Sequence, residues 1–171
     1  GILEEAGCDG IFYSVQNAEV TRFTYQEYRD WVTPSDKKVL EYANTLSKYN
    51  ILHCCGWDAD EAGTVNRMEV WQDYPSAAVN WASSVDGMDA DEVRFFFGVR
   101  AAWGGFDNRR CGILYRGTKE EIQRETRKLI KNAGKSGYLL GPDCSLPDDI
   151  SEERIRWVLE AARSEEEEDN V

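Results

Sequence analysis

Short apolar clusters alternate with polar loops and helix start signals along the whole chain of 171 residues. The clusters are rich in β-branched and aromatic residues, which predicts strands. After each cluster comes a Thr or Asp with Glu three residues later, the spacing of a capping box at a helix N-terminus. The pattern occurs five times, with strands predicted at 9–16, 50–55, 77–83, 101–107 and 138–144.

The five helix start signals are Thr24, Asp58, Asp89, Thr118 and Asp149. The first predicts a helical region over about 25–47 that is interrupted near Pro34, and the second predicts a helix over about 60–72. The others predict a helix from Asp89, one from Thr118 to about Asn132, and one that ends at about Ser164. The acidic run that follows predicts a solvated, disordered tail over residues 165–171.

Strands that alternate with helices predict a parallel α/β sheet with right-handed crossovers. A doubly wound sheet and part of a (β/α)8 barrel both satisfy this pattern. Five units are too few to close an eight-stranded barrel, which usually takes about 250 residues. In either architecture, function lies at the carboxyl ends of the strands. Polar residues gather at these predicted ends: Ser14, Gln16, His53, Cys55, Asn80, Ser83, Asp107, Asn108, Asp143 and Cys144.

The net charge of −12, from 32 acidic and 20 basic residues, argues against nucleic acid or an anionic membrane as the main partner. No apolar run approaches the roughly 20 residues that span a bilayer. The five cysteines are an odd number and no signal peptide precedes them, which favours a cytoplasmic, reduced protein. The chain begins with Gly1 in what reads as the end of a helix, so we expect a fragment of something longer.

The segment 50–57 carries the clearest candidate chemistry. Residues two apart on a strand point to the same face, so His53 and Cys55 should lie together and Cys54 opposite. Cys144 ends another predicted strand and should open onto the same edge. One imidazole and two thiolates suit zinc, and three protein ligands leave the fourth position open, as in catalytic zinc sites. The alternative is a buried core histidine, the only one in the chain, beside ordinary buried cysteines. Cys8 and Cys111 receive no role.

Several landmarks together resemble the uroporphyrinogen decarboxylase superfamily, which includes the decarboxylase and the zinc-dependent methylcobamide:thiol (coenzyme M type) methyltransferases. The likeness covers nearly the whole chain. It implies that residues 1–164 form the C-terminal five βα units of a (β/α)8 TIM barrel, strands four to eight, leaving the barrel incomplete. The matching segments are 6–14 (AGCDGIFYS), 52–56 (LHCCG), 80–81 (NW), 104–107 (GGFD), 117–122 (GTKEEI) and 141–147 (GPDCSLP).

Within that superfamily, the methyltransferases carry His-x-Cys and a distant Cys as zinc ligands, and His53, Cys55 and Cys144 fall on these positions. The decarboxylases instead have a histidine in the last glycine-rich loop, where this chain has Pro142-Asp143-Cys144. Their arginine motif and catalytic aspartate belong to the first half of the barrel, which this chain lacks. One decarboxylase-like feature remains, because Ser14 matches a position that contacts substrate carboxylates. The resemblance therefore favours the zinc branch.

The resemblance to the zinc branch implies methyl transfer from a methylcobamide, carried by a partner corrinoid protein, to a thiol that zinc activates. Candidates for contacts to the substrate or behind the metal ligands are Ser14, Gln16, Asn80 and Asp107. Tryptophans 57, 81 and 103 either line the mouth of the site or pack in the core. Two unpaired sheet edges predict pairing with the missing N-terminal half of the barrel, or self-association. The alternatives are a metal-free decarboxylase-like enzyme of porphyrin metabolism and a non-catalytic fragment that needs a partner.

Overall fold

The computed structural model describes residues 2–56, 64–98, 100–134 and 136–169. Five strands form one fully parallel sheet in the order β1-β2-β3-β4-β5. Each strand pairs with the next one in sequence, so every crossover moves one place in the same direction. This is the winding of a (β/α)8 barrel, because a doubly wound sheet reverses direction. The strands are β1 (Phe12–Val15), β2 (Ile51–Cys54), β3 (Ala78–Trp81), β4 (Ala101–Phe106) and β5 (Tyr138–Pro142).

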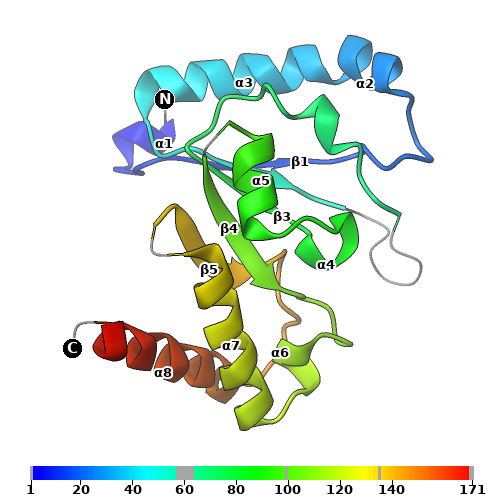
Figure 1. Cartoon of the computed structure of the whole chain (residues 1–171). Coiled ribbons are helices and arrows are strands. Elements are labelled where there is room, and N and C mark those ends of the chain that lie inside the picture. The colour runs from blue at the N-terminus through cyan, green and yellow to red at the C-terminus, as the bar shows by residue number, and fades with distance from the viewer. Residues whose placement is uncertain (1, 57–63, 99, 135, 170–171) are drawn as a thin grey trace.

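Helices follow β1, β3, β4 and β5, and the described residues between β2 and β3 contain only a 3₁₀ turn. The parallel strands alternating with helices confirm the predicted α/β fold. Figure 1 shows the chain direction turning strongly between β1 and β4, as in the wall of a barrel. Helix α5 packs against β4, and α7 packs against β5 and α8. The helices are α1 (Ile2–Glu5), α2 (Tyr25–Trp31), α3 (Thr33–Leu46), α4 (Ser83–Asp86), α5 (Ala90–Phe96), α6 (Ile113–Arg116), α7 (Lys119–Ala133) and α8 (Glu152–Asp169), with one 3₁₀ turn, η1 (Met68–Val70).

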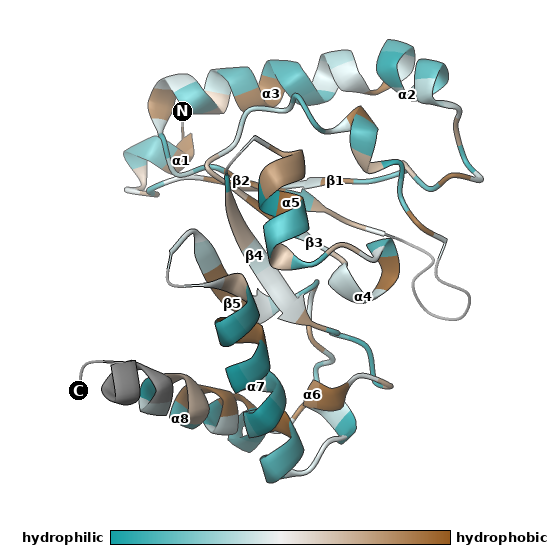
Figure 2. Cartoon of the chain, in the orientation of Figure 1, coloured by the Kyte–Doolittle hydropathy of each residue, from teal (hydrophilic) through white to brown (hydrophobic). Residues whose placement is uncertain are grey.

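The main core lies between the sheet and the helices. Alternate strand residues point to this side and are almost fully buried: Val15, Leu52, Cys54, Val79, Trp81 and Ala102. In Figure 2 the strands are largely apolar or neutral in colour, whereas helix α7 is largely hydrophilic. A smaller cluster of Phe106, Leu114 and Ile122 lies where α6, α7 and α8 meet. One face of the sheet is therefore well sealed.

The other face of the sheet is open in the part of the chain that the structure describes. Phe12 is 49% exposed and Leu139 is 48% exposed, on β1 and β5 respectively. Strands β1 and β5 are the two ends of the sheet order. In a complete barrel this face lines the interior and strand pairing closes the sheet. The architecture is thus that of a partial barrel with its inner wall accessible.

Three of the predicted capping boxes are confirmed. Thr24, Asp89 and Thr118 each accept a hydrogen bond from the backbone N–H of the Glu three residues on, and that Glu accepts one in return. The prediction at Asp149 is wrong, because Asp149 pairs with Arg110 and the Ser151 hydroxyl instead accepts from the Glu153 N–H.

Helix α8 ends later than the predicted Ser164. It continues to Asp169, so the acidic residues 165–169, which the sequence assigns to a disordered tail, lie within the helix. Glutamate has a favourable helix propensity, which accounts for the continuation. Within the described residues, no helix is both long enough and apolar enough to cross a membrane.

The predicted helix over 60–72 is wrong in its described part, which contains only the turn η1. The backbone there pairs with a distant loop instead. The Val20 N–H donates to the Val65 carbonyl, and the Arg67 N–H donates to the Ala18 carbonyl. These long-range bonds use the groups that a helix would pair locally. The predicted cap at Asp58 lies outside the described residues.

Replacing Leu52 by Ala should lower the free energy of unfolding by about 2–5 kcal/mol, because Leu52 is fully buried and the space is hard to refill. The matched control is Leu159→Ala on α8, where the side chain is half exposed and the expected loss is below about 1 kcal/mol. Denaturant unfolding followed by circular dichroism measures both. Equal losses would contradict the assignment of the sealed face as the main core.

Candidate metal centre

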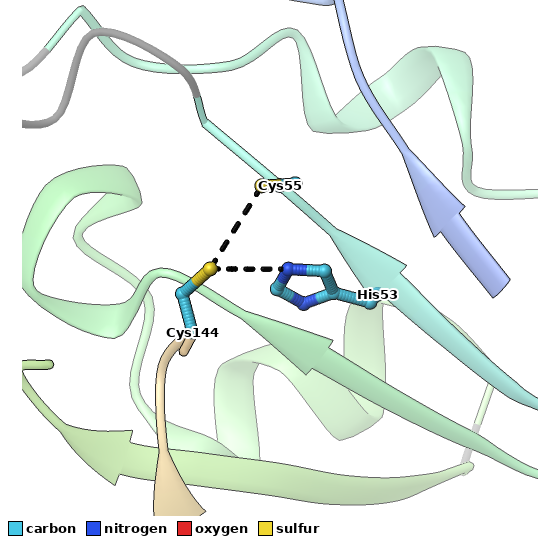
Figure 3. A group of neighbouring side chains, drawn as sticks. All are labelled: His53, Cys55 and Cys144. Atoms are coloured by element: carbon cyan, nitrogen blue, oxygen red, sulfur yellow. Dashed lines mark hydrogen bonds between the residues drawn. The ribbon is translucent and has the colours of Figure 1, made fainter. Parts of the chain in front are cut away.

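The three predicted metal ligands converge at the carboxyl edge of the sheet. His53 lies in β2, Cys55 is the first residue after that strand, and Cys144 lies just beyond β5. Cys144 Sγ is 3.4 Å from His53 Nε2 and 3.9 Å from Cys55 Sγ, and all three ligand atoms lie within 4.8 Å of one another. Figure 3 shows the three side chains pointing toward a common centre. Cys54 points to the sealed face and is fully buried, as the strand alternation predicts.

The spacing of these atoms fits a tetrahedral zinc ion. With bonds of about 2.3 Å to sulfur and about 2.0 Å to nitrogen, tetrahedral ligands lie about 3.5 Å (S to N) and about 3.8 Å (S to S) apart. The observed separations of 3.4 and 3.9 Å are close to both. All three ligand atoms lie within 4.8 Å of one another, and with three protein ligands one position of the tetrahedron stays available to another ligand.

Asn80 orients the imidazole. Its side-chain oxygen lies in hydrogen-bond contact with His53 Nδ1. Its amide nitrogen donates to the carbonyls of Trp103 (2.7 Å) and Pro142 (3.1 Å), which fixes the direction of the amide. The oxygen can only accept, so His53 Nδ1 carries a proton, and Nε2, which faces Cys144, is the ring nitrogen available to bind a metal. A ring nitrogen held this way is typical behind metal-binding histidines.

The two cysteines have opposite electrostatic roles. Hydrogen bonding from the Cys55 thiol and from His53 lowers the pKa of Cys144 well below its ordinary value. The negative Cys144 sulfur and burial together raise the pKa of Cys55, while Ser14 and Gln16 act against this shift. Without metal, the first thiolate therefore forms at Cys144. A divalent cation would supply the positive charge that lets Cys55 ionise as well.

The ligands border a cavity of about 400 Å³ on the open face of the sheet. Of the predicted contact residues, Ser14, Gln16 and Asn80 all line it. Ser14, His53, Asn80 and Trp103 occupy one row across strands β1 to β4. The full lining is Phe12, Ser14, Gln16, His53, Cys55, Asn80, Trp103, Pro142, Cys144 and Ser145.

The structure does not bring Asp107 into this cavity. Its carboxylate accepts hydrogen bonds from the Arg109 backbone and guanidinium, and it lines a separate cavity beside α7. A role for Asp107 toward the substrate therefore stays a prediction without geometric support. The pairing of Asp107 with Arg109 is local: the two residues are two positions apart in the loop after β4, so their contact does not bring Asp107 to the inner face of the sheet.

The three tryptophans have different positions. Trp103 lines the metal cavity, whereas Trp81 packs in the core and donates its indole N–H to the Met88 carbonyl. Trp57 lies outside the described residues. Phe12, which no sequence signal marked, stacks on His53 at 5.0 Å and meets Trp103 edge-on at 5.4 Å between ring centroids. The candidate ligand His53 is thus covered on one side by the Phe12 ring, which Trp103 contacts in turn.

Sequence reasoning also missed the buried carboxylate of Asp143. It is fully buried next to the ligand Cys144 and accepts from Ser83, Ser84 and the Gly105 N–H. Burial raises the pKa of Asp143 to about 6, although these hydrogen bonds oppose the shift. The only sequence signal was a polar residue at the predicted end of a strand, which is equally typical of a solvated loop.

In metal-free protein, the rate of alkylation of Cys144 should change little between about pH 6 and about pH 8, because its thiolate is already formed. A thiol with an ordinary pKa of about 8.5 would react roughly tenfold faster per pH unit there. Iodoacetamide labelling with peptide mass spectrometry measures the rate, with the exposed Cys111 as internal reference. Parallel pH profiles at Cys144 and Cys111 would contradict the electrostatic description.

Comparison with known proteins places the chain at the level of a family. No curated protein matches it significantly. The family model described as uroporphyrinogen decarboxylase (URO-D) matches residues 2–165, almost the full chain. The parallel sheet of successive βα units agrees with that match. The chain therefore belongs to the uroporphyrinogen decarboxylase (URO-D) family.

Proposed function

We propose that this chain carries the zinc site of a methyl transfer from a methylated corrinoid to a thiol. The observation that supports it is the convergence of one imidazole and two thiols, within 4.8 Å, on a cavity at the carboxyl edge of the sheet. Soft ligands of this kind select zinc over magnesium or calcium. Three protein ligands leave a position for the acceptor, as in catalytic zinc sites.

In this proposal His53 Nε2, Cys55 Sγ and Cys144 Sγ hold the ion. Zinc bound there supplies Lewis acidity, which lowers the pKa of a coordinating thiol so that the thiolate prevails at neutral pH. The acceptor sulfur then forms a bond to the methyl carbon, the cobalt–carbon bond breaks, and its electron pair stays on cobalt. The methylcobamide is a substrate carried by a partner corrinoid protein.

The remaining residues would position and shield the acceptor. Asn80 fixes the ring of His53 through its two backbone anchors. Phe12 presents apolar surface beside the imidazole, and Trp103, which contacts Phe12, adds apolar surface to the same cavity; this surface would shield that side of the thiolate from water. Ser14 and Gln16, next to Cys55, are the candidate contacts to the substrate. The main task of the chain is thus to orient and desolvate the acceptor.

A decarboxylase-like activity on porphyrins is the second candidate. Family membership favours it, and Ser14, which resembles a carboxylate-contacting position, does line the cavity. Against it, Pro142-Asp143-Cys144 stands where the resemblance places the loop with the decarboxylase histidine, and Cys144 lies against His53. A third candidate is a non-catalytic half-barrel that acts only with a partner subunit. Function depends on the site and not on the shared fold, so the cysteine pair favours the zinc reaction.

We also propose that the open face of the sheet is covered in the functional protein, either by the N-terminal half of the barrel or by self-association. The half-exposed Phe12 and Leu139 and the two end strands support this, since open edges promote association. A reducing compartment such as the cytoplasm suits the proposal, because both cysteine ligands must stay reduced to bind metal.

Protein purified without added metal should contain about one zinc per chain, and Cys144→Ser should lose it, because one ligand bond and its thiolate charge disappear. Elemental analysis measures the content. The matched control is Cys111→Ser, which removes an exposed thiol away from the cavity and should keep the metal. The loaded protein is then assayed for thiol methylation with a methylated corrinoid, with and without the N-terminal half-barrel.

Absence of zinc from both the unaltered protein and Cys111→Ser would overturn the methyltransferase proposal and leave a decarboxylase-like or inactive half-barrel. Zinc without methyl transfer, even with the N-terminal half supplied, would favour the non-catalytic fragment.

Light scattering after size exclusion should give a mass above that of the 19.5 kDa chain, because the open face and the two unpaired strand edges promote association. Phe12→Ser should shift the equilibrium toward monomer by removing exposed apolar area, whereas Phe95→Ser, at an exposed position on α5, should not. A monomer under all conditions would contradict the association proposal.

A further inference from the structure

We propose that Asp143 is a positioning residue, whose buried carboxylate holds the end of β5 so that Cys144 Sγ faces His53 and Cys55. The inference rests on the proposed metal site but concerns a group that is not itself a ligand. Four observations carry it: the burial of Asp143, its donors, the backbone bonds around it, and the backbone conformation of the glycine that supplies one of those donors.

The Asp143 carboxylate is fully buried and both of its oxygens are used. Oδ1 accepts from the Ser83 hydroxyl (2.9 Å) and the Gly105 N–H (3.0 Å). Oδ2 accepts from the Ser83 hydroxyl (2.9 Å), the Ser84 N–H (3.1 Å) and the Ser84 hydroxyl (3.2 Å). These donors belong to the start of α4 and to β4. One side chain thus ties three segments together.

A buried carboxylate contributes little net stability to a fold. Its desolvation is costly, and an apolar side chain of similar size often gives equal or better stability. The role of this carboxylate is instead explained by the next residue in sequence, Cys144. β5 ends at Pro142, so Cys144 is beyond the regular strand ladder and its place depends on how residue 143 is held.

The backbone on both sides of this carboxylate is also fixed. The Asp143 N–H donates to the Phe106 carbonyl (2.8 Å), and the Pro142 carbonyl accepts from the Asn80 amide (3.1 Å). Asn80 in turn contacts His53 Nδ1. The imidazole and the strand end before Cys144 therefore share one anchor, and Asp143 supplies a second anchor on the side away from His53.

Gly105 gives Asp143 access to a backbone donor. Its φ is +112°, in the region that favours glycine, and its N–H bonds to Asp143 Oδ1. A Cβ atom there would come within 2.4 Å of the Tyr138 hydroxyl oxygen. The glycine-rich end of β4 and the aspartate just after β5 are thus parts of one arrangement, although 38 residues separate them.

The test compares Asp143→Asn with Asp36→Asn. Asp36 serves as the control, because its partly buried carboxylate also accepts from hydroxyl groups, those of Tyr13 and Tyr74, and it lies on α3 outside the cavity. Zinc affinity is measured by competition with a chromogenic chelator. Asp143→Asn should weaken it about 10–100-fold, the usual effect of losing a group that orients a ligand, and Asp36→Asn should not.

Cobalt substitution gives a signature that general destabilisation would not produce. Co²⁺ bound by two thiolates has an intense sulfur-to-metal charge-transfer band. At saturating Co²⁺, Asp143→Asn should show a weaker or shifted band because one sulfur is displaced, whereas Asp36→Asn should match the unaltered protein. Ser84→Ala removes a single hydroxyl donor and should give a smaller change in the same direction, which covers the case where Asp143→Asn does not fold.

A metal-free readout separates this proposal from the proposed function. Diamide oxidises two nearby thiols to a disulfide and is itself reduced to the hydrazine, so the rate of Cys55–Cys144 bond formation reports the approach of the two sulfurs. This rate should fall on the order of tenfold in Asp143→Asn, since small displacements strongly affect such reactions. If it falls while the unaltered protein binds no zinc, the positioning role stands and the proposed function fails. Unchanged disulfide rate and unchanged zinc affinity would overturn the positioning role.

Discussion

The curvature of the parallel sheet is the constraint on which the convergence of His53, Cys55 and Cys144 depends. His53 belongs to β2 and Cys144 follows β5, so two whole strands lie between them in the sheet. In a flat sheet, strands about 4.8 Å apart would leave these side chains far from contact. Coiling toward a barrel folds the strand ends inward, and the Nε2 and Sγ atoms come within 3.4 Å. The same curvature gives the sheet an outer face, which the helices cover, and an inner face, on which these side chains meet.

On the inward face, polar groups are arranged so that each one constrains the next. Asn80 on β3 reaches His53 on one side and the backbone of β4 and β5 on the other. This explains why an amide, which can accept and donate at once, suits the position. Beyond it, Asp143 is held by hydroxyl and backbone N–H donors. The negative charges gathered here, on a chain with net charge −12, are what a divalent cation would offset.

Membership of the URO-D family accounts for the scaffold, while the chemistry depends on side chains at the strand ends. Parallel barrels place every loop that can carry function at one edge, so different reactions can use the same framework. The cysteine beside His53 is therefore more informative about reaction type than the rest of the sheet. In the described residues the inner wall is open, with Phe12 and Leu139 half exposed.

The sequence by itself determined the order of strands and helices, three of the helix starts, and the shared face of His53 and Cys55. These follow from local rules, since strand alternation and capping boxes involve neighbouring residues only. The meeting of Cys144 with that pair also followed, because parallel strands end at one edge. Tertiary structure decided what depends on distant partners. Backbone hydrogen bonds to residues 18–20 occupy the segment before η1, where the sequence predicted a helix. Asp107 pairs with Arg109 and does not line the cavity of His53 and the two cysteines. The tautomer of His53 and the burial of Asp143 required Asn80, Ser83 and Ser84 from other strands and turns, which no local pattern could specify.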